Sequence, residues 1–258
     1  MKAQQADLDL TLQLVREVSA LVAQAFEADQ QVWHKSDGSP VTAVDLAAED
    51  HIRQRLAAVH PTDAVVGEER PPKAGTSGRR WIMDPLGGTA SFVQRIPLFC
   101  VDLAMEDEHG PAVAVSSYPI GGVTLEGARG LGSRVHHREH VFTAAVSQRS
   151  TVDGAKICAL NLKSWPTPLL TALHQRCSLT DGVHAAHRLM RGEVDAVVYA
   201  GNGMGYDDLA CLPVLIEEAG GRVTDLTGKP VLSGNGTVLA SNGLLHDELL
   251  ALIASAVS

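Results

Sequence analysis

Residues 81–89 have the sequence WIMDPLGGT, in which a short apolar run leads directly into an acidic residue and a turn. Such a run predicts a buried strand, with Asp84 at its end. Pro85 restricts the backbone, and the glycines at 87 and 88 allow the chain to approach a ligand closely. Residues 89–93 can form a helical turn whose first amides are free to bind a phosphate group. Taken alone, the segment is equally consistent with an ordinary glycine-rich turn between a strand and a helix.

Three other segments place acidic residues beside turn residues or at a helix start, namely residues 37–45, 67–69 and 207–208. A single acid in such a place is usually a solvated cap. Several converging acids would repel one another unless a cation lay among them, and carboxylate oxygens select Mg²⁺, Ca²⁺ or Mn²⁺. Whether these segments converge is not determined by their spacing in the sequence.

The apolar pattern predicts a mixed α/β protein of layered sheets covered by helices. Helices are expected at residues 7–27, 42–59, 167–177, 182–192, 207–219 and 243–256. Strands are expected at residues 64–66, 81–83, 113–117, 122–125, 157–160, 195–199, 222–225 and 237–240, with a glycine-rich loop at 127–132. A boundary between 145 and 150 divides the chain into two packed halves, residues 1–147 and 148–258.

Composition narrows the range of partners. The 258 residues include 21 Lys and Arg against 30 Asp and Glu, a net charge of −9, which argues against a nucleic-acid polymer or a membrane surface as partner. No apolar run approaches the roughly 18 residues that span a bilayer, and residues 1–13 lack the pattern of a signal peptide, so a cytoplasmic location is expected. The four dispersed cysteines are expected to be reduced and mostly in the core.

Together, the motifs resemble those of the inositol monophosphatase superfamily. They are K-x-D-x-x-P-V-T-x-x-D at 35–45, G-E-E at 67–69, W-I-x-D-P-L-x-G-T-x-x-F-V at 81–93, D-x-A at 208–210, E-A-G-G at 218–221 and V-L-A-S-N at 238–242. The resemblance implies a layered α/β/α/β/α sandwich, shared with fructose bisphosphatases, and commonly a homodimer. It also implies an Mg²⁺-dependent, lithium-sensitive phosphatase, with Mn²⁺ as an alternative ion. The substrate would be a small phosphorylated metabolite such as an inositol, histidinol, sugar or nucleotide phosphate.

The resemblance also implies roles for the matching residues. Glu68, Asp84 and the carbonyl of Leu86 would bind the first metal ion, and Asp84 and Asp208 the second. The catalytic group would be Asp45, Thr89 and Glu68, of which Asp45 and Thr89 orient and deprotonate the attacking water. The substrate would contact Gly88, Thr89, Gly201 and Asp208, with its phosphate on the amides of Gly88 and Thr89. The implied reaction is in-line attack of a metal-activated water, without a covalent enzyme intermediate.

The chain departs from the family motif D-P-x-D-G-T at one position, where Gly87 replaces the second aspartate. That aspartate normally helps to hold the second metal ion. Three outcomes are open: a slower phosphatase that uses a water in its place, an active enzyme in which a neighbour such as Asp207 substitutes, or a relative that binds without hydrolysing. If the site is merely weakened, Gly87→Asp should lower the Mg²⁺ concentration needed for half-maximal activity.

A second departure lies in residues 200–206, with the sequence AGNGMGY. Inositol-specific members place an acidic residue near Gly201, and most members have Trp where this chain has Asp207. Inositol phosphate is therefore a weaker candidate substrate than another small phosphate ester, and residues 206–210 are loosely similar to the histidinol-phosphatase branch. The histidine-rich segment at 136–140 is expected to be a solvated loop.

Overall fold

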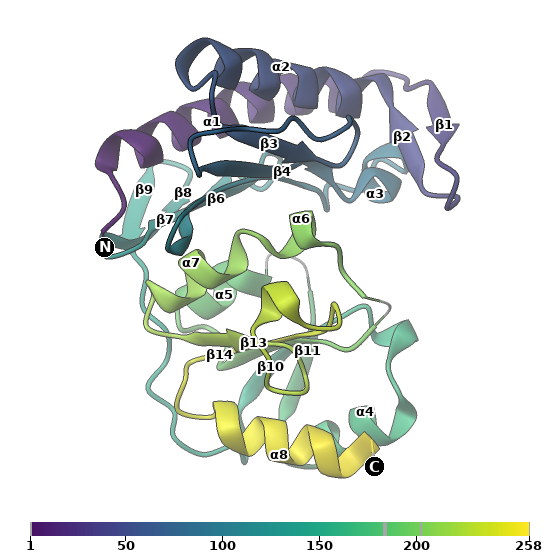
Figure 1. Ribbon diagram of the computed structural model, residues 1–258. Helices are drawn as coiled ribbons and strands as arrows, with labels where there is room; N and C mark the ends of the chain where they lie inside the picture. The colour runs from purple at the N-terminus through teal and green to yellow at the C-terminus, as the bar shows by residue number, and fades with distance from the viewer. Residues whose placement is uncertain (1, 183–184, 202, 258) are drawn as a thin grey trace.

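The computed structural model describes residues 2–182, 185–201 and 203–257 and arranges them in five layers (Figure 1). From top to bottom in Figure 1 these are a pair of long helices, a larger sheet, a layer of short helices, a smaller sheet and a second helix pair. This is the α/β/α/β/α sandwich that the sequence resemblance implies.

The upper helix pair consists of α1 (Gln5–Phe26) and α2 (Ala43–Val59). The apolar face predicted for the first helix is buried, including Leu14, Val18 and Val22. Thr42 caps α2, and its side chain and that of Asp45 form a capping box that begins the helix where the sequence predicts it. The short strands β1 (Val32–His34) and β2 (Pro40–Thr42), which pair between the two helices, were not predicted.

The larger sheet has the strand order β3-β4-β5-β6-β7-β8-β9 and is antiparallel except between β3 and β4. Its strands are β3 (Ala64–Gly67), β4 (Arg80–Gly87), β5 (Cys100–Asp107), β6 (Gly110–Tyr118), β7 (Val123–Ala128), β8 (Gly132–His137) and β9 (His140–Thr143), and the short helix α3 (Thr89–Val93) follows β4. The structure confirms the predicted strands at 64–66 and 81–83 and the hairpin at 113–125. The sequence analysis did not predict β5, β8 or β9.

Two local predictions in this sheet were wrong. The segment 127–132 is not all loop, because β7 continues to Ala128 and β8 starts at Gly132. The histidine-rich segment is a β-hairpin rather than a loop, although residues 138–140 are exposed as expected. His136 lies 3.3 Å from a carboxylate oxygen of the buried Glu126. Both misreadings have the same cause: short strands rich in glycine or histidine lack the β-branched run on which the predictions relied.

The smaller sheet has the order β11-β10-β12-β14-β13. Its strands are β10 (Lys156–Leu160), β11 (Ser178–Asp181), β12 (Ala196–Tyr199), β13 (Arg222–Thr224) and β14 (Val238–Ser241), and its helices are α4 (Thr167–Arg176), α5 (Ala185–Met190), α6 (Tyr206–Leu209), α7 (Leu212–Glu217) and α8 (His246–Val257). The short helical turns η1 (Leu162–Ser164) and η2 (Val231–Ser233) complete this half. Of the predicted helix at 182–192, residues 183 and 184 lie outside the described part of the chain.

The helix predicted at 207–219 is in fact two helices, α6 and α7, separated by a turn at residues 210–211. Pro213 lies in the first turn of α7. Because proline has no backbone N–H and clashes with the preceding turn, it is tolerated at a helix start but not within a helix. The apolar periodicity continues across the break, which is why the pattern alone suggested one helix.

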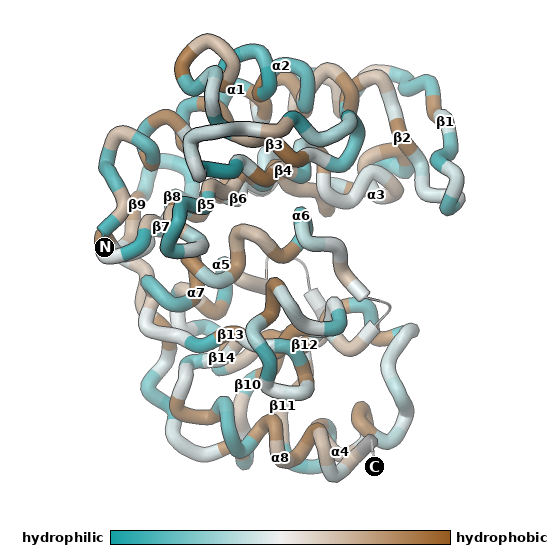
Figure 2. The backbone as a smooth tube through the Cα atoms, in the orientation of Figure 1, coloured by the Kyte–Doolittle hydropathy of each residue, from teal (hydrophilic) through white to brown (hydrophobic). Residues whose placement is uncertain are grey.

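Strand alternation determines which side chains of β4 reach the centre of the molecule. Trp81 and Met83 are buried in the core beneath α1 and α2, whereas Ile82 belongs to the core between the two sheets. Successive strand side chains point to opposite faces, so Asp84 shares the face of Ile82 and points toward the second half. Figure 2 shows hydrophobic residues along the strands of both sheets and many hydrophilic residues along α2.

The proposed boundary at residues 147/148 lies in the connection between β9 and β10. The central core nevertheless includes side chains of both halves, among them Leu125 of β7 and Leu215 of α7. None of the described helices is long and apolar enough to cross a lipid bilayer. Cys158, Cys177 and Cys211 are buried, Cys100 is half-buried, and all four are free thiols, as expected.

Candidate active site

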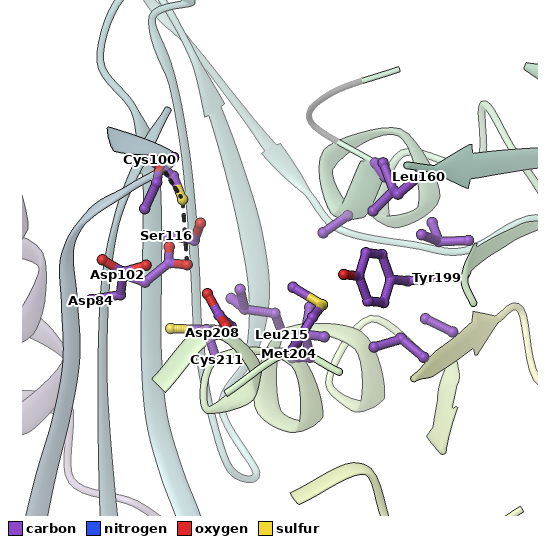
Figure 3. A pocket seen from close by; sticks show the side chains of 18 of the residues that line it. Asp84, Cys100, Asp102, Ser116, Leu160, Tyr199, Met204, Asp208, Cys211 and Leu215 are labelled. Atoms are coloured by element: carbon purple, nitrogen blue, oxygen red, sulfur yellow. Dashed lines mark hydrogen bonds between the residues drawn. The ribbon is translucent and has the colours of Figure 1, made fainter. Parts of the chain in front are cut away.

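A cavity of about 290 Å³ lies between the two halves (Figure 3). The larger sheet contributes a polar wall, in which Asp84 and Asp102 lie close to Ser116. The second half contributes Asp208 and an otherwise mainly apolar wall, which includes Leu160, Tyr199, Met204, Leu212 and Leu215. The cavity thus combines carboxylates on one side with apolar side chains on the other.

Asp84 and Asp208 reach this cavity from elements far apart in the sequence. Asp84 projects from β4 and is only 4% exposed. Burial, together with the negative charges of Glu68 and Asp102, raises the pKa of Asp84 well above its usual value. Burial also raises the pKa of Asp208, whose Oδ2 accepts a hydrogen bond of 2.7 Å from the Gly205 amide at the start of α6. The structure therefore brings together two carboxylates that the sequence singled out.

Asp45 and Thr89 form the second arrangement expected from the motifs. The Thr89 hydroxyl lies 2.7 Å from Asp45 Oδ1 and 3.1 Å from the carbonyl oxygen of Leu86. The other oxygen of Asp45 accepts hydrogen bonds from the backbone and side chain of Thr42, at 2.8 and 2.5 Å. The capping box of α2 consequently fixes the Asp45 carboxylate, and one of its oxygens remains directed at Thr89.

Gly88 connects β4 to α3 and has φ of +93°, in the left-handed region that favours glycine. A Cβ atom at this position would lie 2.9 Å from the carbonyl oxygen of Leu98, so the turn also lacks room for a side chain. β4 itself extends through Pro85 to Gly87, farther than predicted, because a register shift between Asp84 and Gly87 accommodates the proline.

Glu68 is held by an ion pair. The Lys35 ammonium lies 2.7 Å from Glu68 and 2.7 Å from Glu69, so two segments of the sequence motif contact one another directly. Burial alone would lower the pKa of Lys35, but its hydrogen bonds to Glu68 and Glu69 raise it instead. Burial raises the pKa of Glu69.

Asp102 is a cavity residue that the sequence analysis missed. Its Oδ2 lies 3.5 Å from the thiol of Cys100, and burial raises the pKa of Asp102 to about 6, although hydrogen bonds from Ser116 and Cys100 favour the ionised form. One signal could have found it. In the run CVDLAM an acid alternates with Val101 and Leu103, which predicts a strand whose acidic residue lies on the opposite face.

The donor set of this cavity fits a hard divalent cation. Within the described ranges, none of Asp84, Asp102 and Asp208 forms an ion pair, and Asp102 Oδ1 is buried with no hydrogen-bond partner. Buried carboxylates without a counter-ion are costly, and oxygen ligands are those that Mg²⁺ prefers. In the part of the chain that is described, no three Asp, Glu, His or Cys side chains lie close enough together to hold a metal ion as they stand. To bind an ion, Glu68 would have to give up its ion pair with Lys35.

Of the residues considered from the sequence, Asp84, Gly88 and Asp208 line the cavity, whereas Asp45, Glu68, Leu86 and Thr89 do not. Gly201 and Asp207 are also outside it. Gly201 packs against Ser164 and Tyr199 and is not one of the residues that line the cavity. Asp207 does not line it either, because its carboxylate is directed at the backbone of Gly205. Asn202, in the same glycine-rich segment, lies outside the described residues.

Known proteins resemble this chain over nearly its whole length. The profile of the Inositol monophosphatase family matches residues 4–258. The chain is 34% identical to a protein named Histidinol-phosphatase from Mycobacterium tuberculosis, with 95% of this chain and 96% of that protein covered. It is 31% identical to the Inositol-1-monophosphatase of Mesorhizobium japonicum, with 88% of both covered. The crystal structure of the extragenic suppressor protein suhB from Bartonella henselae has the same fold, with a TM-score of 0.84, 22% identity and coverage of 96% and 98%.

These matches extend over nearly the whole chain, so they include both halves of the cavity and every motif identified in the sequence. They confirm the phosphatase class expected from the motifs and a small phosphorylated molecule as substrate. The chain belongs to the inositol monophosphatase family.

Proposed function

We propose that this chain is a metal-dependent phosphomonoesterase that hydrolyses its substrate by direct attack of water. The observation that carries the proposal is the Asp45–Thr89 pair, fixed by the capping box of α2 and joined through Thr89 to the Leu86 carbonyl beside Asp84. Glu68, Asp84, the Leu86 carbonyl and Asp208 are the groups that would hold Mg²⁺ or Mn²⁺. When bound, such an ion lowers the pKa of a water and stabilises charge on the leaving oxygen.

The chain's own residues then have distinct tasks. Because Thr89 donates its hydroxyl proton to Asp45, its lone pairs remain available to accept a hydrogen bond from the attacking water. A proton released by the water passes to Thr89 Oγ1, while Asp45 Oδ1 receives the proton of Thr89. The amides of Gly88 and Thr89, at the start of α3, would bind the phosphate oxygens.

The apolar cavity wall favours some substrates over others, according to the alcohol to which the phosphate is esterified. Leu160, Tyr199 and Met204 offer few hydrogen-bond partners for a polyol, and the glycine-rich segment at 200–206 adds no acidic side chain to the described wall. An alcohol with a flat or apolar portion fits this wall better. Histidinol phosphate is therefore the first substrate to test, in agreement with the name of the Mycobacterium tuberculosis relative.

A phosphate-release screen tests the proposal. Histidinol, inositol, sugar and nucleotide phosphates are each incubated with the protein and Mg²⁺ or Mn²⁺, beside the variants Glu68→Ala and Asp84→Asn. Asp107→Asn is a matched control, because Asp107 pairs with Arg129 at the far end of β5. We expect release by the wild type and Asp107→Asn, and a loss of at least about 100-fold in the two site variants. Equal release by wild type and site variants on every substrate would contradict the proposal and favour the alternative of a relative that binds without hydrolysing.

We also infer from family habit that the protein is a homodimer located in the cytoplasm. Analytical ultracentrifugation at micromolar concentration should then give about twice the 27.3 kDa mass of one chain. A single species at the monomer mass would contradict the dimer.

A further inference from the structure

Asp102 occupies a specific place relative to Asp84. In the antiparallel pairing of β4 and β5, Asp84 is directly opposite Asp102, and Gly87 is opposite Cys100. Directly opposed residues of an antiparallel pair project from the same face of the sheet. Figure 3 shows Asp84 and Asp102 on neighbouring strands, both at the cavity, with Asp208 facing them from α6.

A side chain at Gly87 would have to displace the side chains of two neighbouring residues. A Cβ atom added there would lie 2.6 Å from Asp84 Oδ2 and 2.7 Å from Cys100 Sγ, both closer than a real Cβ contact. The Cys100 thiol thus fills the space beside Gly87 and also lies 3.5 Å from Asp102 Oδ2. Two residues of the neighbouring strand β5 thus take the place of an aspartate at residue 87: Cys100 occupies the space, and Asp102 provides the negative charge.

Asp102 has hydrogen-bond donors in Ser116 and Cys100 but no positively charged partner among the described residues. Its Oδ1 is buried and, among the described residues, accepts no hydrogen bond. Within the same described ranges no Lys, Arg or His pairs with it. A carboxylate placed in this way costs free energy unless a cation compensates it. The cavity it faces already contains Asp84 and Asp208.

Asp207 is the competing candidate from the sequence, and the structure disfavours it. A Cβ atom at Gly205 would lie 2.4 Å from Asp207 Oδ1, which shows that this carboxylate lies against the backbone at the start of α6. Asp102 lines the cavity, whereas Asp207 does not.

We propose that Asp102 supplies the carboxylate that Gly87 lacks, so that Asp84, Asp102 and Asp208 together hold the second divalent cation. This inference rests on the proposed metal-dependent function. On this proposal the site does not lack a ligand, because the carboxylate is supplied near the start of β5 instead of at the end of β4.

Metal binding provides the test. Metal-free wild type, Asp102→Asn, Asp207→Asn and Asp107→Asn are titrated with Mn²⁺, and the free ion is measured by electron paramagnetic resonance. Loss of partners outside the first coordination shell typically weakens metal affinity 10- to 100-fold, so loss of a direct ligand should weaken the second site by at least about tenfold. We expect that loss in Asp102→Asn alone. Equal binding by wild type and Asp102→Asn, or a loss confined to Asp207→Asn, would overturn the proposal.

A transfer of the carboxylate gives a second, positive readout. Cys100→Ala and Asp102→Ser, combined with Gly87→Asp, should recover the Mn²⁺ affinity that Asp102→Ser loses. Removing the thiol relieves one of the two close contacts at residue 87, and the other is with the Asp84 carboxylate, which can rotate. Gly87→Asp alone should not strengthen binding, which reverses the expectation drawn from the sequence. Circular dichroism melting of each variant separates loss of the site from loss of the fold, and failure of a folded triple variant to regain affinity would contradict the inference.

The two proposals fail differently. If wild type releases no more phosphate than Glu68→Ala, the proposed function is wrong. If wild type releases phosphate but binds a single Mn²⁺, or if Asp102→Asn keeps both ions, the function stands and the role of Asp102 is refuted.

Discussion

At the scale of single residues, the site depends on hydrogen bonds that fix Asp45 and direct Thr89. Asp45 has one oxygen committed to the start of α2 and the other to Thr89. Thr89 donates its only proton within the protein and must therefore accept from a water. Substitutions at Thr89 and at Gly88 test this arrangement and the tight turn beside it.

Removing the Thr89 hydroxyl should slow the chemical step. We expect Thr89→Ala to lower kcat by about 10² to 10⁴ with little change in KM, because general base catalysis is lost while the phosphate amides remain. Thr89→Ser keeps the hydroxyl and should retain most of kcat. Steady-state phosphate release at saturating Mg²⁺ measures both, and a Thr89→Ser variant as slow as Thr89→Ala would argue that the methyl group, not the hydroxyl, matters.

Adding a methyl group at Gly88 should damage both stability and phosphate binding. Gly88→Ala meets the Leu98 carbonyl oxygen at 2.9 Å and has φ of +93°. Gly78→Ala is the matched control, since Gly78 has φ of +83° but open space around it. Backbone strain of about 1 kcal/mol is common to both, so a larger loss of Tm and a higher KM are expected for Gly88→Ala only. Equal effects would show that strain, rather than the close approach, decides.

At the scale of elements, helix α8 is anchored by a buried histidine. His246, at its first residue, is 0% exposed and lies 2.9 Å from both Thr224 of β13 and Ser241 of β14. Burial, with a smaller effect of the Arg222 charge, lowers the pKa of His246 from 6.5 to about 4. The neutral imidazole thus joins α8 to two strands of the smaller sheet.

This histidine should make stability depend on pH in a defined window. Because the folded pKa is lower than the unfolded one, the contribution is fully present above pH 6.5 and is lost as the pH falls from 6.5 toward 4. Urea unfolding at pH 7.5 and pH 5 should show a loss of up to about 2 kcal/mol from this group. His246→Gln should lack that part of the loss. An identical pH dependence in the variant would exclude His246 as its source.

At the scale of the whole molecule, one core joins the two halves. The central cluster includes Leu125 of the larger sheet and Leu215 of α7, and the cavity with its carboxylates lies at the same junction. A site assembled across such a junction requires both halves to be folded and docked.

The shared core predicts cooperative unfolding. Leu125→Ala removes a fully buried side chain outside the cavity and should lower the free energy of unfolding by about 2 to 5 kcal/mol within a single transition. Leu244→Ala, at a residue 57% exposed, should change it by less than about 0.5 kcal/mol. Calorimetry that resolves two transitions, only one of which shifts, would show that the halves unfold independently.

The sequence by itself determined the family and the layered fold, and it singled out most of the residues for which we propose catalytic roles. These features are local: apolar periodicity follows from helix and strand geometry, and the motifs place Asp45, Glu68, Asp84 and Thr89 at helix starts and strand ends. It did not reveal β5, because the strand CVDLAMED has few β-branched residues and includes an acid that breaks the apolar run. Asp102 was missed for the same reason.

Only the tertiary structure decided how these residues combine. The register of β4 and β5 sets Asp102 opposite Asp84, the Cys100 thiol fills the space at Gly87, and α6 directs Asp208 rather than Asp207 toward the cavity. Register and packing depend on contacts between residues distant in the chain, which a single sequence does not encode in any local pattern. In the sequence, Gly87 therefore suggests that a metal ligand is missing, whereas in the folded protein the Asp102 carboxylate lies on the neighbouring strand.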